Sequence, residues 1–388
     1  MLQLAEGMDR ILGEGALQVL KEAHQLEQVG KKILHFEIGQ PDFPTPDNIK
    51  RAGIQAIEDD FTRYTMTTGI PELKYAIQDE IESTRFFRPD LEQIAILPGA
   101  KTGIYLSMIS ICNPKDEVIY PDPGFPTYHS LCEYIGAKPV PIQLKEENRF
   151  RMSPEDIANE ISPKTKMIIL NSPQNPTGSV MTKEELEQIA VIAEENDCFI
   201  LSDEIYSKLV YDIEFFSATS YDEASERSIL LDGFSKSHSM TGWRLGYLIG
   251  PRFFVEKLET LMVNAFTCTS EFVQKAGVAA LKGPQNDQIR MRSVFQKRRD
   301  AIVDGLNNIP GFRCQKSQGA FYAWPNITET GMSSKKMAHY LLHEAGISCL
   351  PGTAFGAGGE GYLRFSYATS METIAEAMMS IKKAIMRI

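Results

Sequence analysis

Between Gln93 and Gly250 the chain alternates between short apolar runs and longer segments with helical periodicity. The apolar runs are rich in β-branched residues and nearly continuous in apolar character, which is typical of strands buried on both faces. The predicted strands are Ile94–Leu97, Glu117–Tyr120, Lys138–Ile142, Met167–Leu170, Cys198–Leu201, Ser228–Leu231 and Leu245–Ile249.

Helical patterns separate these runs, for example at Lys101–Ile111 and Thr182–Glu195. Thr182 is followed three residues later by Glu185, which is the form of a helix-starting capping box. Strands and helices that alternate in this way predict βαβ units, and therefore a mostly parallel sheet covered by helices.

After Gly250 the pattern changes to long helices and then to short strands. Pro251 can start a helix that Gly283-Pro284 would end, and Asn286 to about Asn308 predicts a second, charged helix. The remainder predicts an α+β unit. Its expected strands are Ala320–Trp324, Ser348–Leu350 and Tyr362–Ser366, and its expected helices are Lys335–Glu344 and Met371–Met386.

A length of 388 residues suits two domains. The chain starts with a helical pattern at Leu12–Gln28, and the proline-rich turn Gln40–Pro46 then prevents any further helix. We expect residues 1–45 to form an N-terminal arm and part of the small domain, residues 46–285 the large domain, and residues 286–388 the small C-terminal domain.

Composition and charge exclude several classes of protein. With 43% hydrophobic and 23% charged residues, the chain is neither disordered nor of low complexity. A net charge of −11 gives no reason to expect binding to nucleic acid or to an anionic membrane. The six cysteines form no CxxC pair and have no histidine at ligand spacing, which predicts neither a metal site nor disulfides. No apolar run approaches ~18 residues and the N-terminus has no signal-peptide pattern, so we expect a cytoplasmic protein.

A glycine-rich segment, Gly356–Gly361, satisfies the GxGxxG pattern of dinucleotide-binding folds. That function needs a strand before the glycines and a helix after them. Here the glycines lead instead into the strand-like Tyr362–Ser366. We interpret the segment as a flexible loop.

Polar residues directly follow several predicted strands. Gly99 precedes a predicted helix, and this turn is either an ordinary one or a site where backbone N–H groups bind a phosphate. The segment Asn171–Gly178 is either a plain loop or a pair of amides that orient a ligand. Asp203 follows a buried run, where a carboxylate is costly unless it caps a helix or meets a cation.

Three cations stand in segments that carry few other charges. Lys236 follows another predicted strand, although most exposed lysines are simply solvated. Arg244 lies between Trp243 and Leu245, and Arg364 lies in the last predicted strand. Each arginine is expected to have an anionic partner in the protein or in a ligand.

These segments together resemble the fold type I aminotransferases of the aspartate aminotransferase class I/II family, which use pyridoxal 5′-phosphate (PLP). The resemblance implies an α/β fold, with a large domain built on a mostly parallel seven-stranded sheet covered by helices and a smaller α+β domain. The matching motifs, in the family order, are Ile38–Phe43, Asn175–Gly178, Asp203–Tyr206, Ser235-Lys236 and Arg364.

The resemblance assigns three residues to catalysis. Lys236 would form the Schiff base with PLP and then move the Cα proton, and a neighbouring cation such as Arg244 would lower its pKa. Asp203 would pair with the pyridine nitrogen, and Tyr206 would bind the ring 3′-oxygen. The resemblance also assigns cofactor-binding positions to Gly99, Ala100, Lys101, Phe125, Asn175, Ser235, Arg244 and Tyr64, and substrate-binding positions to Gly39, Asn175 and Arg364.

The implied activity is transfer of an amino group between an L-amino acid and a 2-oxo acid. Arg364 would clamp the substrate α-carboxylate, and Tyr64 would reach the cofactor phosphate of a neighbouring subunit, which implies a homodimer with shared active sites. Lys101 contacts either a substrate side-chain carboxylate, which weakly favours acidic donors, or the cofactor phosphate. Phe125 stands where aspartate-specific members often have tryptophan. The physiological direction stays open.

Two other functions compete with transamination. A PLP-dependent lyase, decarboxylase or cyclising synthase would share Lys236 and Asp203. The effector half of a transcription regulator is disfavoured because the sequence has no basic segment to contact DNA phosphates.

Overall fold

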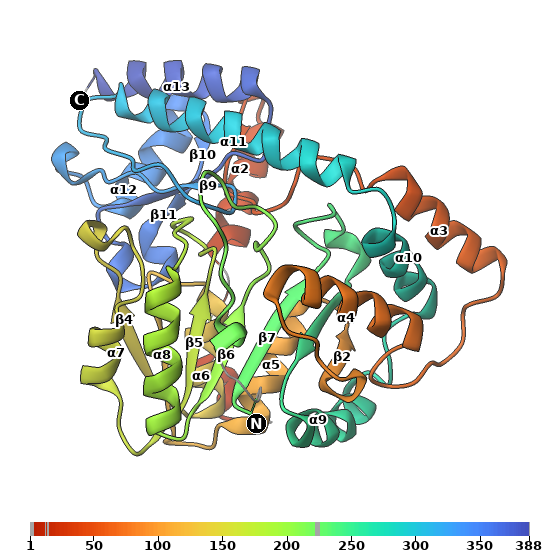
Figure 1. The fold of residues 1–388 in the computed structure, drawn as a ribbon. Coiled ribbons are helices and arrows are strands. Elements are labelled where there is room, and N and C mark those ends of the chain that lie inside the picture. The colour runs from red at the N-terminus through yellow and green to blue at the C-terminus, as the bar shows by residue number, and fades with distance from the viewer. Residues whose placement is uncertain (1–3, 12, 14, 222–225, 388) are drawn as a thin grey trace.

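Seven strands form the central sheet of the computed structural model, which describes residues 4–11, 13, 15–221 and 226–387 (Figure 1). Their order is β2-β8-β7-β6-β5-β3-β4, and β8 alone runs antiparallel to both of its neighbours. The sheet is therefore mostly parallel, as predicted. Its strands are β2 (Ile94–Leu97), β3 (Glu117–Asp122), β4 (Lys138–Gln143), β5 (Thr165–Asn171), β6 (Phe199–Asp203), β7 (Ser228–Gly233) and β8 (Gly246–Ile249).

Helices cover both faces of this sheet because its strands are apolar on both sides. Ile168 and its neighbour Ile169 point to opposite faces and belong to two different buried clusters. One cluster takes side chains from α5 (Ala100–Ile111), α6 (Pro126–Ile135) and α9 (Arg252–Ala265), and the other from α7 (Pro154–Glu160) and α8 (Lys183–Glu195). The predicted capping box of α8 is confirmed, since Thr182 Oγ1 accepts from the backbone N–H of Glu185.

The prediction of one helix from Pro251 to Gly283 is wrong. The structure has two helices, α9 and α10 (Glu271–Lys282), and Thr267 between them has a left-handed φ of 66°. The two helices pack on different partners, because α9 contacts α5 whereas α10 contacts α3 (Asp47–Glu58) and α4 (Pro71–Arg85). Because the two helices pack on different partners, the chain must change direction between them. The hydrophobic pattern of the segment does not predict this change.

The remaining elements form a second, smaller unit. Strands β11 (Leu350–Pro351), β12 (Leu363–Ser366) and β9 (Tyr322–Ala323) form an antiparallel sheet, and β1 (Leu34–His35) pairs with β10 (Ile347–Ser348). The predicted strand Ser348–Leu350 is thus wrong in detail, because Cys349 separates two strands of different sheets. Its helices are α2 (Gly15–Gln28), α11 (Asn286–Asn307), α12 (Ser334–Tyr340) and α13 (Met371–Ile385), and a π-helical turn, Leu341–Ala345, follows α12. The short α1 (Gly7–Arg10) packs instead on α6 of the large unit.

One buried cluster joins the two ends of the chain. It contains Phe36 from the N-terminal part together with Phe295 of α11, Phe365 of β12 and Ile381 of α13. The domain boundaries after residues 45 and 285 stay a prediction. Within the described residues, no helix is both long enough and apolar enough to cross a bilayer.

The glycine-rich segment leads directly into β12, as its interpretation as a loop requires. It is packed against the large sheet rather than projecting into solvent. The backbone N–H of Gly358 donates to Asp122 Oδ1 at 3.1 Å, and a Cβ on Gly356 would overlap the same carboxylate. The need for glycine at these positions is therefore steric, and no dinucleotide fingerprint is present.

Candidate active site

Lys236 lies three residues beyond the end of β7, at the edge of the sheet where the parallel strands end. Its Nζ donates a hydrogen bond to the backbone oxygen of Gly39, at 2.5 Å, and lies 6.0 Å from the centre of the Phe321 ring. The amine is thus held between the turn that contains Gly39 and the small unit.

The pKa of Lys236 is lowered to about 8. Loss of surrounding water is the largest cause, and the positive charges of Arg364, Lys101 and Arg244 lower the pKa further, while Asp203 opposes the shift. Consequently a substantial fraction of the amine is neutral, and hence nucleophilic, close to physiological pH.

Asp203 ends β6 and is buried. Burial raises the pKa of its carboxyl to about 6, and the hydroxyl of Tyr128, which donates to Oδ2 at 2.7 Å, opposes that rise. Burial also raises the pKa of Tyr128 well above its usual range, so this hydroxyl keeps its proton. The sequence analysis missed Tyr128, although it lies three residues after Phe125, at the start of the same helix.

Arg364 comes from β12 of the small unit and is buried at the site. Its guanidinium lies 4.4 Å from the centre of the Tyr322 ring and 4.8 Å from that of Phe355. It donates to Asn175 Oδ1 at 3.0 Å and to the backbone oxygen of Glu37. These contacts hold a planar cation that can bind a carboxylate through two parallel hydrogen bonds.

Tyr322 is a second residue that the sequence analysis missed. Its hydroxyl shares a hydrogen bond of 2.6 Å with that of Tyr206 and packs so close to Gly39 that a Cβ there would overlap it. Burial raises the pKa of Tyr206 well above its usual range. Tyr322 therefore links Tyr206, Gly39 and Arg364, and only the tertiary structure brings these residues together.

The turn before α5 approaches the guanidinium of Arg244. Gly99 has a left-handed φ of 92°, and a Cβ on it would overlap Arg244 Nη2. Arg244 Nη1 donates to the backbone oxygen of Thr241 at 2.9 Å. Ala100 begins α5, so the helix N-terminus and the arginine lie at the same place. Backbone N–H groups, the helix dipole and a guanidinium are the donors that a phosphate requires.

The other predicted residues lie in three different settings. Ser235 is buried beside Lys236. The ammonium of Lys101 lies over the Phe125 ring, 5.0 Å from its centre. Tyr64 lies on the connection between α3 and α4 and is 86% exposed, so folding of one chain leaves its ring in solvent.

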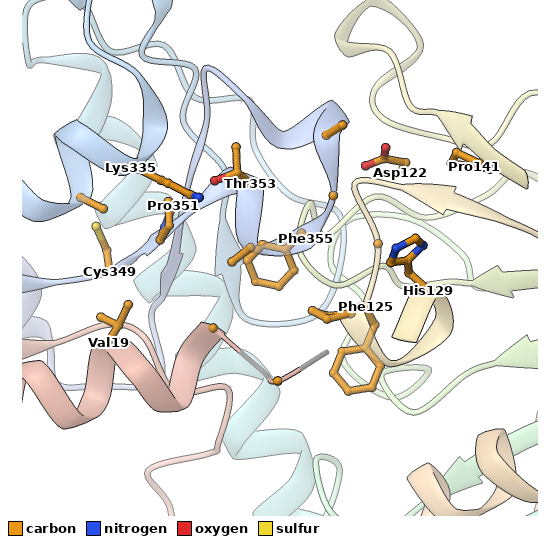
Figure 2. A pocket seen from close by; sticks show the side chains of 18 of the residues that line it. Val19, Asp122, Phe125, His129, Pro141, Lys335, Cys349, Pro351, Thr353 and Phe355 are labelled. Carbon is orange, nitrogen blue, oxygen red and sulfur yellow. The ribbon is translucent and has the colours of Figure 1, made fainter. Parts of the chain in front are cut away.

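A cavity of about 970 Å³ adjoins these residues (Figure 2). It opens between α2, the start of α6 and the segment before β12, and Asp122, His129 and Thr353 border it. Lys236 does not line it. The cavity nevertheless reaches the site, because Phe355 packs against Arg364 and Phe125 against Lys101, and both rings line its wall.

A compensated charge cluster lies at the same sheet edge. Arg85 donates to Glu204 Oε2 at 3.2 Å and to Asp232 Oδ2 at 2.6 Å, and the side chains of Arg85 and Glu204 are each 1% exposed. Ser207 also donates to Asp232, and Ser217 to Glu204. The sequence analysis missed this cluster, because its members are far apart in the chain.

Comparison with known proteins decides the family. Residues 31–381 match the family model of "Aminotransferase class I and II". The chain belongs to this family. It is 40% identical to an aspartate aminotransferase of Pyrococcus horikoshii, over 94% of each chain, and 38% identical to aromatic-amino-acid aminotransferase 2 of Thermococcus litoralis, over 94% of this chain and 95% of that one. The crystal structure of the aspartate aminotransferase from Rhizobium meliloti is 32% identical, with a TM-score of 0.96 and full coverage of both chains.

This protein is therefore a PLP-dependent aminotransferase of fold type I. The residues at the site fit the cofactor in position and in charge. The glycine cradle beside Arg244 suits a phosphate, and the buried carboxylate of Asp203 suits a protonated ring nitrogen. Lys236 offers an amine of lowered pKa between them. Bound PLP supplies an electron-accepting ring that stabilises negative charge at the substrate Cα.

Proposed function

We propose that Lys236 attaches the cofactor and afterwards moves the proton at the substrate Cα. The support is the lowered pKa of its amine together with the position of Asp203, whose carboxylate would keep the cofactor ring nitrogen protonated. In this assignment Tyr206 and Asn175 hold the ring oxygen. Gly99, Ala100, Lys101, Ser235 and Arg244 surround the phosphate, and Phe125 stacks on the ring.

We further propose that the amino donor is a dicarboxylic L-amino acid of the aspartate or glutamate type. The observation that carries this proposal is the convergence of three cations, Arg364, Lys101 and Arg244, on the amine of Lys236. The cofactor phosphate and the α-carboxylate of a substrate account for two of these charges. A side-chain carboxylate would meet the third, Lys101, whose ammonium lies over the Phe125 ring in the wall of the cavity. Gly39 would lie beside the α-carboxylate.

The test compares kcat/KM for acidic and non-acidic amino donors in the Lys101→Met variant. Lys101→Met should lower kcat/KM for aspartate and glutamate about tenfold or more relative to alanine and phenylalanine, because a charge-assisted hydrogen bond contributes roughly 1.5–3 kcal/mol. Arg364→Ala should instead raise KM for every donor alike, because all of them have an α-carboxylate. If Lys101→Met weakened all donors equally, Lys101 would contact the phosphate and the dicarboxylic assignment would fail.

A separate observation favours a second class of amino donor, the aromatic amino acids. Two aromatic rings, Phe125 and Phe355, line the cavity of about 970 Å³ next to Arg364, and one relative is named an aromatic-amino-acid aminotransferase. An aromatic donor would place its ring against them. A higher kcat/KM for phenylalanine or tyrosine than for aspartate in the unaltered enzyme would favour this class. Stoichiometric consumption of the 2-oxo acid in the same assay excludes a lyase.

We propose that the enzyme is a homodimer in which Tyr64 completes the partner's phosphate site. The exposed ring of Tyr64 supports this, as do the neighbouring exposed side chains of Met66, Ile54 and Ile57. Light scattering should give twice 43.5 kDa. Tyr64→Phe should weaken PLP binding without changing the mass, and a monomeric mass would overturn the assignment.

We also propose that the enzyme works in the cytoplasm and binds neither nucleic acid nor membranes. Its six cysteines are free thiols, as suits a reducing compartment, and its net charge is −11. Cell fractionation tests this proposal, which recovery of the enzyme outside the soluble cytoplasmic fraction would contradict.

A further inference from the structure

Two histidines and a glutamate meet outside the group of residues around Lys236. Within the described part of the chain, Glu22, His339 and His343 form a group whose possible ligand atoms all lie within 4.8 Å of one another. Glu22 comes from α2, whereas His339 lies in α12 and His343 in the π-helical turn that follows it. Residues more than 300 positions apart in the chain thus present three metal-binding side chains at one point.

The contacts inside this group suit a metal ion. His343 Nε2 lies 3.0 Å from Glu22 Oε1, and the rings of His339 and His343 stack with their centres 4.2 Å apart and an angle of 28° between planes. Histidines four residues apart on one helical face are a recurrent zinc-binding arrangement. In a tetrahedral site with bonds of about 2.0–2.1 Å, neighbouring ligand atoms lie roughly 3.3 Å apart. The possible ligand atoms lie within 4.8 Å of one another and must approach to this shorter distance. The three side chains are half-buried or exposed, so they can move without disturbing a core.

We propose that Glu22, His339 and His343 bind one divalent cation of the Zn²⁺ class, with water in the remaining position. Two imidazoles and one carboxylate favour Zn²⁺, Co²⁺ or Ni²⁺ over Mg²⁺ and Ca²⁺, which prefer sites made of oxygen atoms. None of these three residues has a place in the transamination chemistry assigned above.

The ion would tie α2 to the α12 segment. Glu22 and His339 also line the cavity of about 970 Å³, which Val19 of α2 and Lys335 of α12 border in Figure 2. Lys31, in the segment after α2, donates a hydrogen bond of 3.3 Å to the backbone oxygen of His343 in this turn. Metal binding would add a second link between these segments and would stabilise the folded chain.

Isothermal titration of the tag-free, PLP-loaded enzyme with Zn²⁺ tests the proposal. One ion per chain with a micromolar Kd is expected, whereas Mg²⁺ should give no saturable heat. Glu22→Gln should weaken binding at least tenfold, and the His339→Ala/His343→Ala double variant should abolish it. The visible band of the bound cofactor, measured in parallel, should be unchanged in these variants, which separates loss of the metal site from loss of the fold.

A matched control uses His24, the histidine of α2. His24 lies two residues from Glu22 and pairs with Glu27, outside the proposed ligand set. His24→Ala should keep the affinity of the unaltered enzyme. At a Zn²⁺ concentration about 100 times the Kd, the midpoint of thermal unfolding should rise by roughly 2–4 °C in the unaltered enzyme and in His24→Ala only. Equal affinity in the unaltered enzyme and the double variant would overturn the proposal, and so would loss of binding in His24→Ala alone.

Discussion

Two groups of charges lie at the same edge of the central sheet, and they differ in the sign of their excess charge and in their exposure to solvent. Around Arg85, one cation meets two carboxylates and several hydroxyl groups. The amine of Lys236 is influenced by three further cations, Arg364, Lys101 and Arg244, and by one carboxylate, that of Asp203. A buried charge is costly without a partner. In the first group, the balanced group, every charge contacts an opposite charge. In the second, the unbalanced group, cations outnumber carboxylates, which suits the binding of anionic ligands.

The pKa shifts follow this difference. The carboxylates raise the pKa of Arg85, which stays charged, whereas burial and the neighbouring cations lower that of Lys236 to about 8. The fully buried group around Arg85 thus forms a structural ion cluster, whereas the more exposed group around Lys236 contains a reactive amine. The sign of the neighbouring charges sets the direction of each pKa shift.

The largest expected effect is on catalysis at the unbalanced group. Lys236→Ala should lower the rate of amino transfer by roughly 10⁴-fold or more, since it removes both the attachment point and the general base. Steady-state turnover and the visible absorption of the cofactor measure the effect. Cofactor that borohydride could still fix to a lysine of this variant would refute the assignment.

At the balanced group, the effect should be on stability. Arg85→Ala leaves Glu204 and Asp232 buried without their cation, so the free energy of unfolding should fall by about 3–5 kcal/mol. Arg88 is the control, because its side chain is 43% exposed and its ion pairs contribute about 0–1 kcal/mol. Denaturant titration compares the variants, and equal losses would mean that the buried cluster is not structural.

Asp203 is the carboxylate of the unbalanced group. Asp203→Asn keeps the shape and an acceptor for Tyr128 but removes the negative charge, so kcat should fall roughly 10²–10³-fold. Asp197→Asn, just before the start of the same strand and fully exposed, is the control and should leave kcat unchanged. Near-normal turnover in Asp203→Asn would remove this residue from the mechanism.

The smallest effect concerns pH. Because only the neutral amine reacts, the rate at which cofactor-free enzyme captures PLP should rise with pH and level off above about 8. Lys101→Gln removes one of the cations that lower this pKa, so the midpoint of the profile should move upward. Lys183→Gln on α8 is the control. A midpoint that stayed in place in Lys101→Gln would show that Lys101 does not act on Lys236.

Local patterns predicted the large sheet well, because strands buried on both faces leave a continuous apolar signature. Asp203 and Lys236 stood out because they are polar residues near the ends of such strands, but the family resemblance was needed to assign their roles. The break between α9 and α10 and the split at Cys349 could not be predicted, because each reflects a change of packing partner.

The site partners that were missed share another cause. Tyr128 and Tyr322 lie in apolar or aromatic surroundings where a tyrosine needs no special explanation, and their roles depend on the residues they meet. His339 and His343 do carry a local signal in their four-residue spacing. The sequence analysis examined histidines only as companions of cysteine, and so did not find it.

The sequence by itself determined the α/β architecture, the order of the polar strand ends and, through its resemblance to a family, the cofactor. Those properties are encoded in short segments, where periodicity and local polarity act. The tertiary structure alone decided which charges face one another. It placed Arg364 beside Asn175 and Glu22 beside His343, and it left Lys236 among cations. Electrostatic balance depends on distance in space, and distance along the chain does not determine it.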